Sequence, residues 1–171
     1  MLIKTITGLT KASLLALLLS CSFVNAASLD TPRAAYEAKD YKAAFNELKA
    51  LAHEGDASVQ HRIGWMYYVG QGVLQDYKQS LKWYTLAAEQ GMGIAQISVG
   101  LMYFSGRGVL EDQKKAVQWY TLAAEQGISE AQMRLGGQYH SGLGVLQDYK
   151  KAIKWHTLAA EQGNLDAQFN L

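Results

Sequence analysis

Apolar side chains recur along this chain with helical spacing, and glycines interrupt them at regular intervals. Between residues 76 and 91, small and apolar side chains recur at every third or fourth position and would share one face of a helix. They are Ser80, Leu81, Tyr84, Ala87 and Ala88. Asp76 stands directly before this segment, where a carboxylate can accept hydrogen bonds from free amides. Gly91 follows it and can take the left-handed conformation that ends a helix. A second helical segment, about 95–105, ends in a Gly-x-Gly turn, so the pattern predicts a pair of helices.

The pair is repeated in tandem. Residues of the same type stand 36 positions apart at Asp40, Asp76, Asp112 and Asp148, and again at Gly55, Gly91, Gly127 and Gly163. Segments 76–111 and 112–147 are identical at 20 of 36 positions. Short helix pairs of fixed period bury their apolar faces by stacking on one another. The sequence therefore predicts an all-α fold, an α-solenoid of stacked antiparallel helix pairs wound into a right-handed superhelix.

The period also predicts the domain organisation. We expect complete repeats at 56–91, 92–127 and 128–163, preceded by a lead-in over 27–55 that contains the helix 40–54. Residues 164–171 begin a fourth repeat and then stop, which would leave an apolar half-turn exposed. Three explanations are open: the sequence is a fragment of a longer chain, the last helix frays, or a partner covers it. We favour the fragment.

The first 26 residues are typical of a secretory signal peptide. Lys4 and Lys11 precede an apolar run over 13–19, which is too short to span a bilayer, and residues 24–26 offer small or short side chains for cleavage after Ala26. We therefore expect an exported protein, periplasmic or secreted. A second interpretation stays open, because residues 18–21 resemble a lipobox and would place a lipid anchor on Cys21. The leucine before the small residue fits that motif poorly, so an outer-membrane lipoprotein is less favoured.

Charge limits the classes of partner, and cysteine content limits the cross-links that can stabilise the fold. Removal of 1–26 would take away two lysines and no acid, which changes the formal net charge from +1 to −1. A near-neutral protein lacks the basic surface that nucleic acids and anionic bilayers attract. The only cysteine lies in the signal, so the mature domain would contain no disulfide.

The repeat resembles the Sel-one-like repeat family, relatives of the tetratricopeptide repeat. The resemblance is carried by Trp83-Tyr84-x-x-Ala87-Ala88-Glu89-Gln90-Gly91 and by Ala95-Gln96-x-x-Val99-Gly100-x-x-Tyr103-x-x-Gly106-x-Gly108-Val109, and it covers nearly all of the mature chain. It implies a superhelical scaffold for protein–protein interaction, often in exported or envelope proteins, and it does not name a partner.

Two faces of the first helix of each repeat behave differently. The positions of Gln60, Ile63, Gly64 and Tyr67 recur nearly unchanged in the next two repeats and form a packing face. A second stripe varies in residue type from repeat to repeat. By resemblance to tetratricopeptide scaffolds this stripe lines a concave groove, and the expected partner-binding residues are His61, Trp65, Tyr68, Ile94, Ile97, Leu101, Phe104, Met133 and His140. Arg62 and Arg134 would supply polar contacts at its edge. The alternative is that these side chains only pack against one another.

The sequence offers no catalytic or cofactor-binding constellation. The four histidines, His53, His61, His140 and His156, occupy different repeat positions and lack the spacing of metal ligands. The periodic tryptophans Trp83, Trp119 and Trp155 are best explained by packing between repeats. We predict a non-enzymatic scaffold that binds a peptide or protein partner. A secreted effector that engages host proteins is an alternative, and a cell-wall or β-lactam hydrolase is a disfavoured one because no nucleophile and base are apparent.

Overall fold

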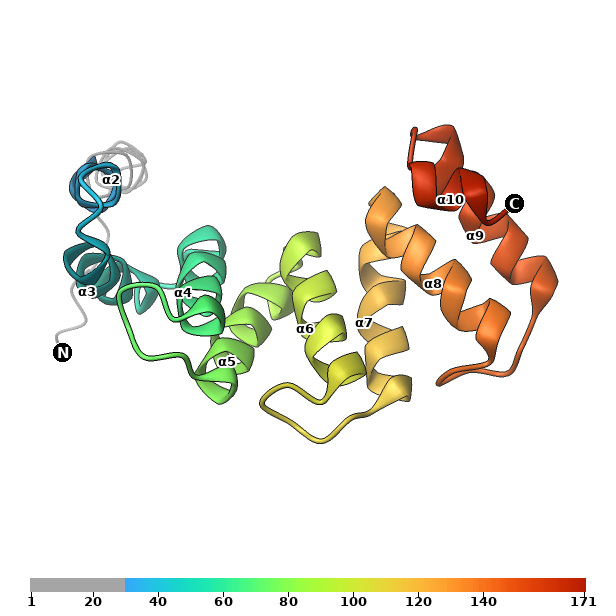
Figure 1. Ribbon diagram of the computed structural model, residues 1–171, viewed down its shortest axis with the longest axis horizontal. Helices are drawn as coiled ribbons and strands as arrows, with labels where there is room; N and C mark the ends of the chain where they lie inside the picture. The colour runs from blue at the N-terminus through green and yellow to red at the C-terminus, as the bar shows by residue number, and fades with distance from the viewer. Residues whose placement is uncertain (1–29) are drawn as a thin grey trace, which may run out of the picture.

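A computed structural model describes residues 30–171, and the predicted signal peptide with Cys21 lies outside that range. The helices are α2 (Asp30–Glu37), α3 (Tyr41–Ala52), α4 (Ala57–Val69), α5 (Tyr77–Glu89), α6 (Gly93–Ser105), α7 (Gln113–Glu125), α8 (Ser129–Ser141), α9 (Tyr149–Glu161) and α10 (Leu165–Phe169). They follow one another along an arc, with α2 at one end and α10 at the other (Figure 1).

Each helix packs chiefly on the helices next to it in sequence. From α2 to α10 the main helix contacts join consecutive helices, such as α4 with α5 and α5 with α6. Residues 30–171 contain no strand. This arrangement confirms the predicted all-α solenoid of stacked helix pairs, while its right-handed sense stays a prediction.

Aspartates cap the second helix of each repeat, which is α5, α7 or α9, as the sequence predicts. The backbone amides of Lys78 and Gln79 donate to Asp76 Oδ1 at 2.9 and 3.0 Å. Asp112 and Asp148 cap α7 and α9 in the same way. Asp56 caps α4 in this way too, whereas α6 and α8 are preceded by Met92 and Ile128, whose side chains make no capping hydrogen bond. Both side chains pack against the apolar core instead.

Glycines allow the close contacts between the two helices of each repeat. A Cβ on Gly100 would lie 2.5 Å from Cε1 of Tyr120, so the tyrosine ring of α7 lies directly over the bare backbone of α6. Gly64 under Tyr84 and Gly136 under His156 repeat this contact. The glycine column of the predicted packing face therefore has a specific partner, an aromatic ring of the following helix.

Buried glutamines join successive repeats, a feature that the sequence analysis did not identify. The side-chain amide of Gln96 donates to Ala88 O at 3.2 Å, and its Oε1 accepts from Gln126 Nε2 at 2.8 Å. The same pair of bonds recurs around Gln60 and Gln132. Each glutamine satisfies a carbonyl at a helix end and holds the turn of the next repeat.

Candidate functional site

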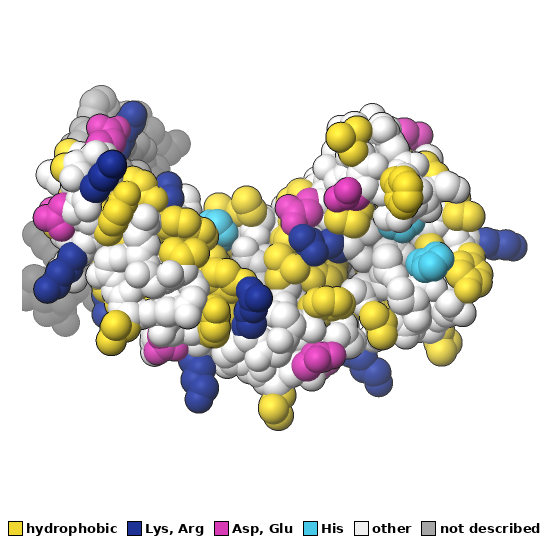
Figure 2. All heavy atoms as spheres, in the orientation of Figure 1, with side chains coloured by type: hydrophobic (Ala, Val, Ile, Leu, Met, Phe, Trp, Pro, Cys, Tyr) yellow, Lys and Arg dark blue, Asp and Glu magenta, His cyan; other side chains and the backbone are white. Residues whose placement is uncertain are grey.

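The predicted stripe lies on α4, α6 and α8, and most of it reaches the surface. Ile94 and Phe104 of α6 are 52% and 37% exposed, and His140 of α8 is also exposed. The half-buried members are His61, Trp65, Tyr68, Leu101 and Met133. Figure 2 shows a hollow between the two ends of the arc, with hydrophobic and charged side chains mixed on its floor.

Ile97 is a correction to that stripe. It is 3% exposed and packs in a core cluster with Val117, Tyr120 and Leu135. Helix α7 of the same repeat and α8 of the next repeat cover it, so it has almost no surface with which to contact a partner. We therefore leave Ile97 out of the candidate site and keep it in the core.

A cleft opens at the α4 end of the stripe. Ser58, His61, Arg62 and Trp65 line a space of about 310 Å³. Ser58 and Arg62 also border a neighbouring cleft of about 570 Å³, whose other walls come from α2 and α3. Together the two clefts offer room for side chains of a bound segment, since small-ligand pockets fall in the range of about 300–1,000 Å³.

Arg62 lies between two aromatic rings in this cleft. Its guanidinium carbon is 5.2 Å from the centroid of Tyr36 and 5.8 Å from that of Trp65. Guanidinium groups bind aromatic faces by cation–π attraction and stacking. Tyr36 also donates a hydrogen bond to Gln71 Oε1 at 2.9 Å, which fixes its ring on α2.

His61 adds a neutral polar group at the side of the cleft. Burial lowers the pKa of His61, and the charge of Arg62 lowers it further. The imidazole lies 5.0 Å from the ring of Tyr84, whose own pKa is raised because the phenol is buried. His61 therefore favours its uncharged form at neutral pH, and Arg62 supplies the positive charge of this cleft.

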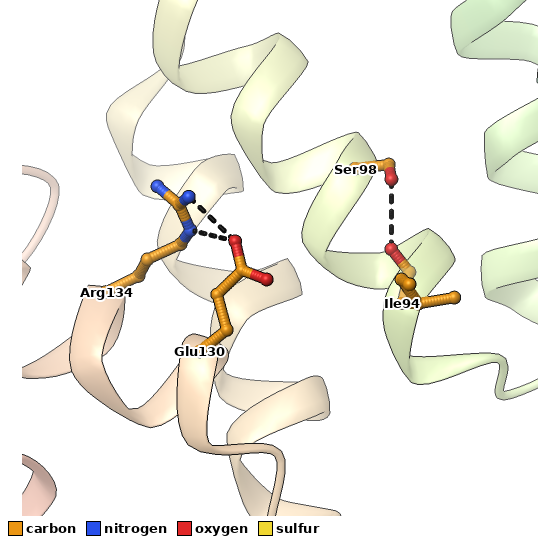
Figure 3. A network of polar contacts seen from close by, with 4 residues as sticks. All are labelled: Ile94, Ser98, Glu130 and Arg134. Carbon is orange, nitrogen blue, oxygen red and sulfur yellow. Dashed lines mark hydrogen bonds and ion pairs between the residues drawn. The ribbon is translucent and has the colours of Figure 1, made fainter. Parts of the chain in front are cut away.

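The α8 end of the stripe has a different polar arrangement. Arg134 donates to Glu130 Oε1 from Nε at 3.1 Å and from Nη2 at 2.8 Å (Figure 3). On α6, Ser98 Oγ donates to the carbonyl of Ile94 at 3.0 Å. The charged edge residues predicted from the sequence, Arg62 and Arg134, thus lie on the same face but have different partners.

The periodic tryptophans pack between repeats. Trp83 is buried in a cluster with Phe45, Leu48 and Val59. Trp119 and Trp155 are half-buried and pack against the clusters of the repeats before them. This placement agrees with a packing role for the tryptophan column.

Metal-binding and membrane-spanning features are absent from the part of the chain that the structure describes. Its His, Cys, Asp and Glu side chains form no group of three or more that could hold a metal ion. None of the helices between residues 30 and 171 is long and apolar enough to cross a bilayer.

Stacked helix pairs of constant period define an α-helical repeat protein. The Sel1 repeat model matches residues 57–92, 93–128 and 129–164, each copy beginning one residue later than the repeats predicted above. The chain belongs to the Sel1 repeat family, whose members typically act as scaffolds for protein–protein interaction and are generally not catalytic.

Solved structures of similar proteins agree with this assignment. The protective antigen c5321 of uropathogenic Escherichia coli, which displays an SLR fold, is 39% identical, with a TM-score of 0.73 over 74% of this chain and 27% of that one. A Sel1 repeat protein from Oxalobacter formigenes is 36% identical, with a TM-score of 0.74 over 80% of this chain and 56% of that one.

Cysteine-rich protein B of Helicobacter pylori is 25% identical, with a TM-score of 0.59 over 74% of this chain and 96% of that one. A search of curated proteins found no match. The chain thus spans about a quarter of the first of these structures and about half of the second.

Proposed function

We propose that this protein is an exported scaffold that binds a peptide segment of a partner protein along the stripe on α4, α6 and α8. The observation that carries the proposal is that apolar side chains on one face of α6 reach the surface: Ile94 and Phe104 are exposed and Leu101 is half-buried. Contiguous apolar surface on a soluble protein usually marks a binding site. Aromatic anchors such as Trp65 and Tyr68 contribute strongly to such interfaces.

The stripe varies between repeats while the packing face does not. Ser58, Ile94 and Glu130 occupy one column of the three helices, and Tyr68, Phe104 and His140 occupy another. A purely structural role would favour the same side chain at each equivalent position, as in the glycine and glutamine columns. The variation supports recognition of a segment whose side chains differ along its length.

A matched pair of variants tests the stripe. Ile94→Ser combined with Phe104→Ser removes exposed apolar surface from α6, while Leu110→Ser removes a leucine that is 87% exposed on the α6–α7 loop. Both proteins should keep the helical circular dichroism of the wild type. We expect the stripe variant to lose binding to peptides selected from a random library, and the loop variant to bind them normally. Equal binding by all three proteins would refute the groove.

Export is tested separately. The amino-terminal pattern supports cleavage after Ala26, and mass spectrometry of the protein from osmotic-shock and culture-supernatant fractions would identify the mature end. A protein confined to the culture supernatant would favour the effector alternative. An uncleaved protein in the cell interior would contradict export.

A further inference from the structure

Equivalent arginines on α4 and α8 have unequal surroundings. Arg62, Ser98 and Arg134 stand 36 residues apart on the first helices of successive repeats. Arg134 has an acidic partner one turn earlier on its own helix, because Glu130 Oε1 accepts from two of its nitrogens (Figure 3). The residue one turn before Arg62 is Ser58, which has no carboxylate. Two arginines at equivalent positions therefore differ: Arg134 has a carboxylate one turn earlier on its helix, and Arg62 does not.

No other carboxylate of residues 31–171 replaces the missing one. None lies within ion-pair distance of Arg62. Glu37, which borders the neighbouring cleft, is paired with Arg33 at 3.0 Å. The Asp56 carboxylate accepts from the amides of Ser58 and Val59 at the start of α4 and from Oγ of Ser58 at 2.5 Å. The nearby acids thus have other partners.

Two aromatic rings lie beside the Arg62 side chain. The π-faces of Tyr36 and Trp65 attract its guanidinium, whose carbon lies 5.2 and 5.8 Å from the ring centroids, and this attraction favours the position that the side chain has here. The N–H groups at the edge of a guanidinium are the donors that bind a carboxylate with one or two parallel hydrogen bonds. Preorganisation of a long side chain lowers the entropy lost on binding.

We infer that the cleft at Arg62 binds the side-chain carboxylate of an Asp or Glu in the partner segment. The inference rests on the proposed function, since it names the chemistry recognised at one end of the same stripe. The carboxylate would lie over Ser58, the place that the Glu130 carboxylate occupies relative to Arg134. An apolar neighbour in the segment would contact Trp65, which lines the same cleft.

Peptide selection provides the test. A library of random 12-residue peptides, displayed on phage without a free carboxyl terminus, is selected against the full mature protein, against Arg62→Gln and against Ser58→Glu. The Ser58→Glu variant keeps Arg62 but gives it an internal carboxylate at the i, i+4 spacing of Glu130 and Arg134. Lys154→Gln is the control, because it removes a cation that also lies over an aromatic ring, 5.8 Å from the centroid of Trp155, but on α9 and outside the stripe. Circular dichroism and thermal unfolding establish that each variant is folded.

We expect peptides selected by the wild type and by Lys154→Gln to be enriched in Asp or Glu at one position. Changing that residue to Asn or Gln in a synthetic, carboxy-amidated peptide should weaken binding about tenfold or more, measured by fluorescence anisotropy. Arg62→Gln and Ser58→Glu should lose this preference and bind the acidic and amide peptides equally.

The outcomes separate the two proposals. Failure to select any peptide would contradict the groove itself, and the carboxylate site with it. Selection of peptides that lack a required acid, or an acid preference unchanged in both Arg62→Gln and Ser58→Glu, would overturn the carboxylate site and leave the groove intact. Binding that requires a free carboxyl terminus in synthetic peptides would also overturn it, because the proposed source is a side chain.

Discussion

Substitution of Gly108 by alanine should destabilise the contact between consecutive repeats. Gly108 lies in the loop between α6 and α7 and has a φ of +74°. A Cβ there would lie 2.4 Å from the carbonyl oxygen of Tyr77 and 2.5 Å from its carbonyl carbon. These are backbone atoms at the start of α5, in the preceding helix pair, so they cannot rotate away as a side chain can. Gly72 and Gly144 make the equivalent contact in the other loops.

The expected cost has two parts. An alanine in the left-handed region costs about 1–2 kcal/mol. Overlap with a packed backbone adds about 1–3 kcal/mol, because the loop must move away from α5. Gly108→Ala should therefore lower the free energy of unfolding by about 2–5 kcal/mol in all.

Gly127 is the matched control. Its φ is +84°, and a Cβ at this position would meet nothing within 4 Å. Gly127→Ala should therefore show only the conformational cost of about 1–2 kcal/mol. Urea unfolding followed by far-ultraviolet circular dichroism measures both variants. Equal destabilisation of the two proteins would refute the proposed overlap, and so would a Gly108→Ala variant as stable as the wild type.

Two further substitutions test the buried polar contacts. Gln96→Leu should lower the free energy of unfolding by about 1–3 kcal/mol, measured in urea, because it leaves the carbonyl of Ala88 and the side-chain amide of Gln126 without their partner. An unchanged free energy of unfolding would show that these two hydrogen bonds do not stabilise the fold. Burial, followed by the charge of His140, holds the pKa of His156 below the usual 6.5. The unfolded chain then binds the proton first, so His156 should make stability fall as the pH drops below about 6.5, whereas both states are neutral above it. His156→Tyr, the residue type found at this position in α5 and α7, should reduce that loss between about pH 8 and pH 5, and an unchanged pH profile would contradict the assignment.

The elements of the fold follow from local signals that are strong in this sequence. Asp76 and its equivalents cap helices because a carboxylate before an apolar-periodic segment satisfies the first amides wherever it occurs. Gly106 ends α6 in the left-handed conformation for an equally local reason. Repetition strengthens these signals, because the capping aspartates and the terminating glycines recur every 36 residues.

Contacts between repeats were harder to predict. Gln96 was assigned to the packing face, but its hydrogen bonds reach a carbonyl eight residues away and an amide thirty residues away. Ile97 lies on the same helix arc as exposed residues, but the following helices α7 and α8 cover it. A helical wheel gives the direction of a side chain, and it does not show how far a neighbouring repeat extends over it.

The candidate site depends on differences among copies of one scaffold. Because the glycine, tyrosine and glutamine columns hold the backbones in the same arrangement, a change in an exposed column alters surface chemistry without altering shape. The surface is then cationic and aromatic at α4 and apolar at α6. At α8 the charge of Arg134 is already satisfied by Glu130. If the proposed groove and carboxylate site are correct, a segment that binds the whole stripe places an acid over α4 and apolar side chains over α6, and the order of these residues in its sequence gives the direction in which it lies along the solenoid.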